Sequence, residues 1–257
     1  MLDLSGGPAL FPAHALRDGY LRADPGDPAA MLRAVLKARD LVGSFDKPQY
    51  VNFTPELCAH SRSQRTGCRR CLDLCPTGAI EPDGDHVRVS AEICAGCGQC
   101  AAACPTGAAS YALPPADTLV QKLRAMLQAY HLAGGTRPVL LLHERGHGTD
   151  LIDALARHGD GLPANVLPLA VNEITQVGLE AIVAAFAYGC SAVRFLLREK
   201  PLHDVTGLTQ TVTMGEIILA GLGLAGPRVA TIETDNPDAL GAALEAIEPA
   251  AAVAQPA

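Results

Sequence analysis

The second half of the chain alternates short apolar runs with amphipathic stretches. Four runs are mostly apolar and are predicted strands, at 138–143, 165–171, 192–197 and 228–233. Helical periodicity fills the stretches between and after them, at 149–158, 177–187, 205–222 and 237–247. Strands that are apolar on both faces are typical of a parallel sheet covered by helices on both sides. The pattern therefore predicts an α/β three-layer domain with a parallel sheet.

The N-terminal part of the chain is patterned more weakly. Residues 1–26 are rich in Gly, Pro and Asp and are expected to be irregular. Asp27 and Pro28 form a helix cap and first turn, and the helix that follows is expected to end at Gly43. This part is predicted to be an extension with one helix.

Between these parts, period-two alternation predicts short strands at 49–53 and 86–90. Further on, a helix begins near Asp117 and ends before Gly134. The predicted organisation is an N-terminal extension, a cysteine-rich α+β domain, a linker helix, the α/β domain and a disordered tail, at 1–48, 49–113, 114–136, 137–248 and 249–257.

The cysteines gather in one segment as two related copies. The copies read "CAHSRSQRTGCRRCLDLCPTGA" (58–79) and "CAGCGQCAAACPTGA" (94–108). A shift of 29 residues superposes the last three cysteines of each copy and the sequence CPTGA that ends it. The second copy has the pattern C-x2-C-x2-C-x3-C-P. In the first copy the leading cysteine, Cys58, lies seven residues further upstream than this pattern requires. Arg65 occupies the position at which the repeat would place that cysteine.

This spacing is specific for iron–sulfur chemistry. A four-iron cube needs four thiolates, and in the bacterial two-cluster pattern the last cysteine of each copy binds the other cluster. We therefore expect Cys58 to replace the thiol absent at Arg65, with residues 59–67 bulging out as a loop. The predicted ligands of the first [4Fe–4S] cluster are Cys58, Cys68, Cys71 and Cys104. The predicted ligands of the second [4Fe–4S] cluster are Cys94, Cys97, Cys100 and Cys75.

Three alternatives compete with this assignment. Two zinc sites with four cysteine ligands each would use the same C-x2-C spacing, although zinc sites usually take their cysteines in pairs. A [3Fe–4S] cluster in the first site would fit its unusual spacing. His60 is an alternative to Cys58 as the fourth ligand.

Three arginines of the first copy, Arg65, Arg69 and Arg70, are expected to form a solvated rim. Alternatively, they raise the reduction potential of the nearer cluster or dock an acidic partner.

Two motifs of the α/β half do not fit their usual chemistry. "HERGH" (143–147) matches a zinc-protease motif, but it follows a predicted strand, whereas that motif needs both histidines on one helix. "GLGLAG" (221–226) matches a dinucleotide fingerprint, but it ends a helix and precedes a strand, which is the inverted order. Polar residues at the strand ends are interpreted as ordinary loops, and Cys190 as a small buried residue. No catalytic residue is predicted.

Charge and hydropathy exclude several classes of function. The net charge of −7 argues against a nucleic-acid partner, because phosphate binding needs clustered Lys and Arg. The start of the sequence has no signal-peptide pattern, and no run of 18 apolar residues predicts a membrane span. We expect a cytoplasmic protein, where dense cysteine indicates metal or redox chemistry rather than disulfides.

The segment 49–111 resembles bacterial two-cluster ferredoxin domains, through the loop "CAGCGQCAAACP", the repeated "CPTGA" and a strand before each loop. The region 137–247 resembles, more distantly, the delta-type iron–sulfur subunit found with hydrogenases and heterodisulfide reductases, through "AYGCSAVRFLL" and "LGLAGPRVATIE". The extra cysteines that such subunits use are absent apart from Cys190, so no third cluster is expected. The arrangement is also similar to iron–sulfur proteins encoded beside bacterial molybdenum or tungsten oxidoreductases, formate dehydrogenase among them.

These resemblances imply an electron-transfer protein or subunit that relays electrons to or from a partner oxidoreductase. The implied partner is a complex of the hydrogenase, heterodisulfide reductase or formate dehydrogenase type. Two alternatives stay open: an oxidoreductase whose α/β domain binds a small cofactor such as flavin, and an accessory factor for a molybdenum or tungsten enzyme.

Overall fold

The computed structural model describes residues 1–11, 19–44, 46–62, 65–224 and 226–248. The chain divides into two compact units, Met1–Lys47 and Pro48–Ala257, and each is described by itself. The predicted disordered tail lies outside the described residues. None of the described helices is both long enough and apolar enough to cross a membrane.

The described part of the N-terminal unit contains two short strands and one helix. Strands β1 (Leu2–Asp3) and β2 (Leu21–Arg22) pair in parallel, so the expectation that residues 1–26 are irregular is wrong for these positions. The carboxylate of Asp3 accepts a hydrogen bond from the buried Tyr20 hydroxyl, which ties the two strands together. Helix α1 (Pro28–Asp40) begins as predicted, because the side chain of Asp27 accepts from the first backbone amides, and it ends three residues before Gly43.

The sheet of the C-terminal half has four parallel strands, as predicted. They are β7 (Val139–Glu144), β8 (Val166–Val171), β9 (Ala192–Leu197) and β10 (Val229–Glu233), in the order β10-β9-β7-β8. Because the chain moves first to one side of β7 and then to the other, the order reverses between β7 and β9, which makes this the topological switch point of the sheet.

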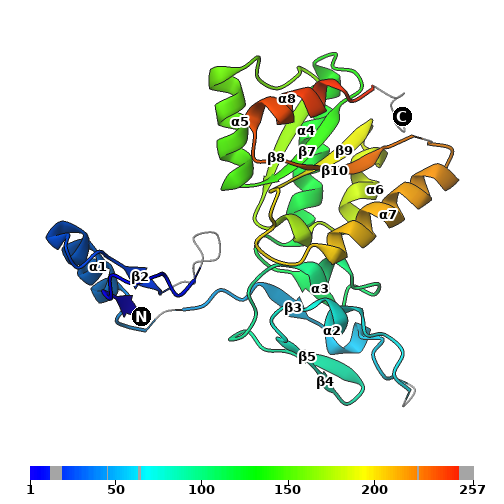
Figure 1. The fold of residues 1–257 in the computed structure, drawn as a ribbon. Coiled ribbons are helices and arrows are strands. Elements are labelled where there is room, and N and C mark those ends of the chain that lie inside the picture. The colour runs from blue at the N-terminus through cyan, green and yellow to red at the C-terminus, as the bar shows by residue number, and fades with distance from the viewer. Residues whose placement is uncertain (12–18, 45, 63–64, 225, 249–257) are drawn as a thin grey trace. The chain divides into compact units, whose positions relative to one another are not determined.

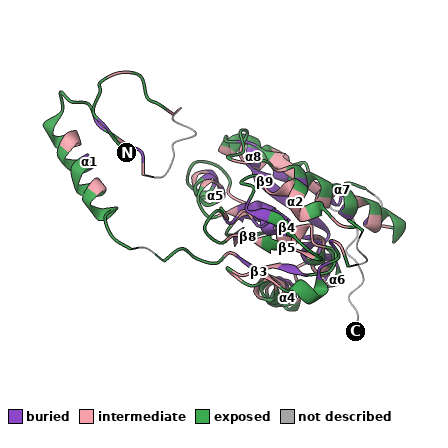
Figure 2. Ribbon diagram, turned by 90° about the horizontal axis from the view of Figure 1, so that it is seen from below, coloured by how far each residue is buried: buried purple, intermediate pink, exposed green. Residues whose placement is uncertain are grey.

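Helices cover both faces of this sheet (Figure 1), and the domain therefore has three layers. One face carries α4 (Ala116–Leu132), α6 (Leu179–Ala187) and α7 (Thr206–Gly221), and the other carries α5 (His147–His158) and α8 (Pro237–Glu245). The strands between the layers are largely buried (Figure 2).

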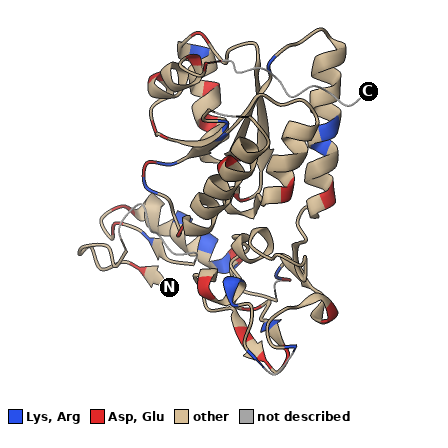
Figure 3. Cartoon of the chain, turned by 90° about the vertical axis from the view of Figure 1, so that its right-hand side faces the viewer, with Lys and Arg blue, Asp and Glu red and all other residues tan. Residues whose placement is uncertain are grey.

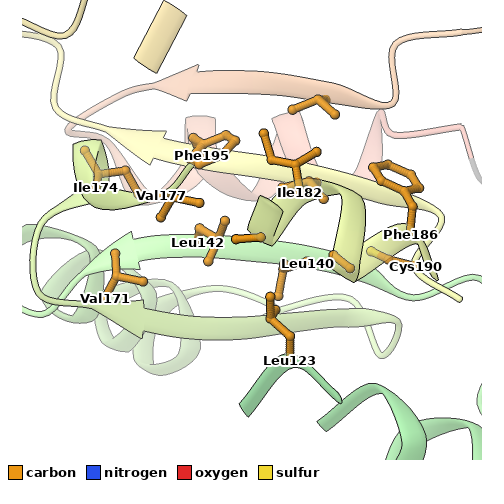
Figure 4. Close-up of a cluster of buried hydrophobic side chains, with 14 of the residues drawn as sticks. Leu123, Leu140, Leu142, Val171, Ile174, Val177, Ile182, Phe186, Cys190 and Phe195 are labelled. Carbon is orange, nitrogen blue, oxygen red and sulfur yellow. The ribbon is translucent and has the colours of Figure 1, made fainter. Parts of the chain in front are cut away.

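Alternate residues of each strand face opposite cores. Leu140 and Leu142 of β7 point toward α4, while Leu141 points toward α5 and α8. Figure 4 shows Leu123 of α4 beneath Leu140 and Leu142, with Phe195 of β9 in the same cluster. Helix α4, expected as a linker, is therefore a layer of the α/β core.

The predicted elements of this half are confirmed, with shifts at their ends. Helix α5 begins at His147, two residues before its predicted start. Gly146 takes the capping position, and Asp150 lies in the first turn, where a carboxylate is favoured by the positive end of the helix dipole. Helix α8 begins at Pro237 as predicted, and the side chain of Asn236 caps it by accepting from two backbone amides.

The cysteine-rich segment folds as two short antiparallel strand pairs with two short helices. Strand β3 (Val51–Phe53) pairs with β6 (Ala109–Tyr111), and β4 (Ile80–Asp83) pairs with β5 (His86–Val89). Helices α2 (Arg70–Leu74) and α3 (Gln99–Ala102) occupy equivalent places in the two copies of the repeat. The predictions included β3 and β5 but missed β4 and β6.

Candidate iron–sulfur site

The loop that separates Cys58 from the rest of the first copy is closed at its neck. A short 3₁₀ helix, η2 (Pro55–Leu57), leads into Cys58. The amide of Cys68 then donates to the carbonyl of Ala59 at 3.2 Å, and the amide of Gly67 donates to the carbonyl of His60 at 2.7 Å. These bonds return the chain to its starting point, so Cys58 lies beside the remaining cysteines despite the longer spacing.

Four thiol groups then converge on one pocket. The pocket is lined by Cys58, Cys68, Cys71 and Cys104, with His60 among its other residues. Burial, together with the neighbouring thiols of Cys68, Cys104 and Cys58, raises the pKa of Cys71 to about 11. The structure thus brings together the four residues predicted for the first cluster.

The other four thiols form a second group. Burial raises the pKa of Cys97, and the nearby thiols of Cys75 and Cys94 raise it further. Burial also raises the pKa of Cys100, with contributions from Cys97, Cys94, Cys71 and Cys75. Each group therefore contains one cysteine from the other copy of the repeat, Cys104 in the first and Cys75 in the second. That the two groups bind clusters stays a prediction.

The repeat places hydrogen-bond donors around the two crossed cysteines. The amide of Ala79 lies 3.2 Å from Sγ of Cys75, and the amide of Ala109 lies 3.4 Å from Sγ of Cys104. Burial opposes ionisation of Cys104, but hydrogen bonds from Ala109, Thr106 and Ala108 outweigh it and lower the pKa of this thiol. Donors aimed at sulfur stabilise a thiolate, which is the form that binds iron.

The chemistry of the donor set fits an iron–sulfur cluster. All nine cysteines are free thiols. Within the described ranges, no three Cys, His, Asp or Glu side chains converge as the ligands of a single ion do. Around a four-iron cube the sulfurs lie further apart, because each binds a different iron.

His60, the alternative ligand, has a structural bond of its own. It is buried, and its Nδ1 lies 2.8 Å from the carbonyl oxygen of Cys68. This bond stabilises the neck of the loop, and the ring still lines the pocket of the first group.

The predicted arginine rim is exposed. Arg65, Arg69 and Arg70 lie at the surface, and Arg69 pairs with Asp73 at 3.5 Å. Figure 3 marks basic and acidic residues along this part of the ribbon. Arg88 pairs with Glu81 at 3.1 Å across the β4–β5 hairpin. These exposed pairs contribute little to stability.

Comparison with known families identifies the cysteine-rich segment. A family model described as a 4Fe-4S dicluster domain matches residues 64–108. This segment is a 4Fe-4S dicluster domain. The match contains seven of the eight clustered cysteines and begins after Cys58, the residue with the unusual spacing. No curated protein matches the chain.

The dicluster domain occupies the edge of the sheet where α/β proteins usually bind ligands. A short helix after β8, η3 (Ile174–Gln176), packs against α3, and the hydroxyl of Thr175 donates to the carbonyl of Cys97 at 2.6 Å. The side chain of Gln99, between Cys97 and Cys100, bonds to the start of α7. Neither Thr175 nor Gln99 was predicted from the sequence. The one local signal was a polar residue, Gln99, between two cysteines.

The remaining polar residues at the strand ends make local contacts. His203 Nε2 lies 3.3 Å from a carboxylate oxygen of Glu173, and this carboxylate raises the pKa of His203. His147 Nε2 lies 2.9 Å from Asp235. His143 lies on β7 while His147 begins α5, which confirms that "HERGH" is not a helix-borne metal motif.

The other two interpretations of the α/β half are also confirmed. The glycine-rich segment "GLGLAG" follows the end of α7 and precedes β10, and residue 225 within it lies outside the described residues. Cys190 is fully buried, and burial raises the pKa of its thiol to about 11, which keeps it protonated.

Proposed function

We propose that the chain is an electron-transfer protein or subunit that carries two [4Fe–4S] clusters in its dicluster domain. The observation that supports this most strongly is the grouping of eight thiols into two sets of four, each completed by a cysteine from the other copy of the repeat. When bound, such clusters accept and release single electrons. The protein supplies the thiolates and the amide donors around them.

The proposed ligand sets are Cys58, Cys68, Cys71 and Cys104 for the first cluster, and Cys94, Cys97, Cys100 and Cys75 for the second. The support for Cys58 over His60 is its position: Cys58 is among the thiols whose charge raises the pKa of Cys71, and the ring of His60 is held by the carbonyl of Cys68. A [3Fe–4S] cluster in the first site is the outcome if Cys58 does not bind iron.

The proposed partner is a cytoplasmic oxidoreductase complex of the hydrogenase, heterodisulfide reductase or formate dehydrogenase type. The support is the resemblance in sequence and the position of the dicluster domain, whose first loop is exposed at Arg65, Arg69 and Arg70. The boundaries proposed for the dicluster domain are 49–113. The α/β domain, predicted at 137–248, also includes α4 (Ala116–Leu132), which packs in its core.

Three variants test the ligand assignment in anaerobically purified protein. Cys58→Ser is expected to lose or convert one cluster, seen as a loss of about half of the iron or as the EPR signal of an oxidised three-iron cluster. His60→Ala is expected to keep both four-iron clusters. Cys190→Ser is the matched control, because its hydroxyl can retain the bonds of the buried thiol to the carbonyls of Pro138 and Ala192. Two intact four-iron clusters in Cys58→Ser contradict the assignment.

Isolation with native partners tests the rest of the proposal. Co-purification with a large oxidoreductase subunit supports the subunit role. A flavin absorption band in the isolated chain contradicts a purely electron-relaying α/β domain.

A further inference from the structure

The two cysteine loops differ in how the rest of the chain covers them. In the second copy, Gly96, Gly98, Gln99 and Cys100 are all buried. In the first copy, the equivalent positions Gly67, Arg69 and Arg70 are exposed. The difference arises because the α/β domain packs on the second loop.

Gln99 is the central residue of this contact. It is 1% exposed, and both ends of its amide are used: Nε2 donates to the carbonyl of Asp204 at 2.8 Å, and Oε1 accepts from the amide of Gly207 at 3.1 Å. Along the chain it lies between two predicted cluster ligands, Cys97 and Cys100. One residue thus joins a predicted cluster ligand to the start of α7.

Thr175 makes a second contact on the same loop. Its side chain is buried, and its hydroxyl donates to the carbonyl of Cys97 at 2.6 Å. Next to it, Asn172 Nδ2 donates to the hydroxyl of Tyr111 at 2.9 Å, which in turn donates to the carbonyl of Gly96 at 2.8 Å. The α/β half therefore holds the carbonyl of Cys97 directly and the carbonyl of Gly96 through Tyr111 of the dicluster domain.

The backbone of the loop also fits closely against the cover. Gly98 has a φ of +76°, and a Cβ atom there would lie 2.6 Å from the Cβ of Gln176. A side chain therefore cannot be placed at this point between the loop and η3.

We propose that the α/β domain is a cover for the second cluster, in which Gln99 and Thr175 are positioning residues that hold the Cys97 loop and set the reduction potential of that cluster. This inference rests on the proposed function, since it requires the two loops to bind clusters. Reduction adds negative charge to a cluster, and water stabilises that charge better than a covering protein layer does. The covered second cluster is therefore expected to have the lower potential, and opening the cover raises it.

The test compares variants of the covered loop with a control in the open one. Gln99→Ala removes both amide bonds, and Thr175→Val removes the hydroxyl while keeping the shape of the side chain. Thr175→Ser retains the hydroxyl and is expected to behave like the wild type. Arg70→Ala is the matched control, because Arg70 is the exposed counterpart of Gln99 at the shift of 29 residues.

The first readout is an EPR-monitored redox titration of protein with wild-type iron content. The transition that Cys58→Ser alters belongs to the first cluster, and the other belongs to the second. Gln99→Ala and Thr175→Val are expected to shift the second transition to higher potential and leave the first in place. Thr175→Ser and Arg70→Ala are expected to leave the second transition unchanged. Equal shifts of both transitions, or no shift in either variant, overturn the proposal.

The second readout is hydrogen exchange by mass spectrometry, which does not depend on redox activity. Peptides covering residues 94–100 are expected to exchange at least about tenfold faster in Thr175→Val than in the wild type, and at the wild-type rate in Arg70→Ala. If residues 94–100 exchange at the wild-type rate in Thr175→Val, the proposed cover on this loop is wrong. If the wild type contains no iron, the electron-transfer function fails, and this measurement still decides whether the loop is held by the α/β domain.

Discussion

Cys71 and Cys100 occupy the same place in the two copies of the repeat, and their thiol groups are close enough that Cys71 contributes to the raised pKa of Cys100. Cys71 belongs to the first group of four thiols and Cys100 to the second. The two groups therefore meet at this pair. In the proposed function, an electron that moves between the clusters passes through the region these residues occupy.

Proximity of the two groups predicts magnetic interaction between the clusters. When both clusters are reduced, their unpaired electrons are expected to interact and to give a broadened, complex EPR spectrum. When one is reduced, the spectrum is expected to be simple. Two superposed simple spectra in the fully reduced protein would contradict the close placement of Cys71 and Cys100.

The packing of the second loop against η3 predicts a large cost for a methyl group at Gly98. Gly98→Ala introduces both left-handed backbone strain and a clash with Gln176, whereas Gly107→Ala introduces strain at φ +71° with no atom within 4 Å. The clash is expected to cost about 1–3 kcal/mol beyond the strain. Anaerobic urea unfolding followed by circular dichroism measures the difference. Equal unfolding midpoints for the two variants would show that the loop is not closely covered.

The position of α4 in the core predicts that its buried face stabilises the α/β domain. Leu123 is fully buried between α4 and β7, whereas Leu132 near the end of the helix is 89% exposed. Leu123→Ala is expected to lower the free energy of unfolding by about 2–5 kcal/mol. Leu132→Ala is expected to change it by less than about 0.5 kcal/mol. Similar small effects in both would mean that α4 is a free linker.

The pair of His203 and Glu173 predicts a pH dependence of stability. Glu173 raises the pKa of His203 above its ordinary value of 6.5. The folded state therefore binds the proton of His203 more tightly than the unfolded state does. The stabilisation is complete below the unfolded pKa of His203 and is lost as the pH rises through the higher folded value. Unfolding midpoints measured between about pH 5.5 and about pH 8.5, a range that brackets the ordinary histidine pKa of about 6.5, should show this loss.

The matched variants for this prediction are both Glu→Gln. Glu173→Gln is expected to remove the loss of stability with rising pH, because the amide carries no charge. Glu245→Gln, at an exposed position near the end of α8, is expected to keep it. The same pH profile in Glu173→Gln and the wild type would show that another group is responsible.

Much of the fold follows from local pattern. Strands such as β7 and β9 are apolar on both faces, and few structures other than a covered parallel sheet accommodate that. Strands β4 and β6 were missed because they are short, and β4 contains Glu81 and Pro82, which are unfavourable in strands. Their pairing depends on tertiary contacts within the dicluster domain.

The candidate site, like the fold, is only partly predictable from the sequence. The spacing of the cysteines predicts two groups of four, and the closed neck at residues 59–68 explains how Cys58 joins the first. The contact of Gln99 with Asp204 and Gly207 joins residues more than a hundred positions apart. No local periodicity encodes such a contact, so the cover on the second loop emerges only from the structure.

The most direct test of the two-cluster proposal is the iron and acid-labile sulfide content of anaerobically purified protein. Two four-iron clusters predict about eight iron and about eight sulfide per chain. Protein that contains no iron, or that contains zinc without sulfide, would contradict the proposal.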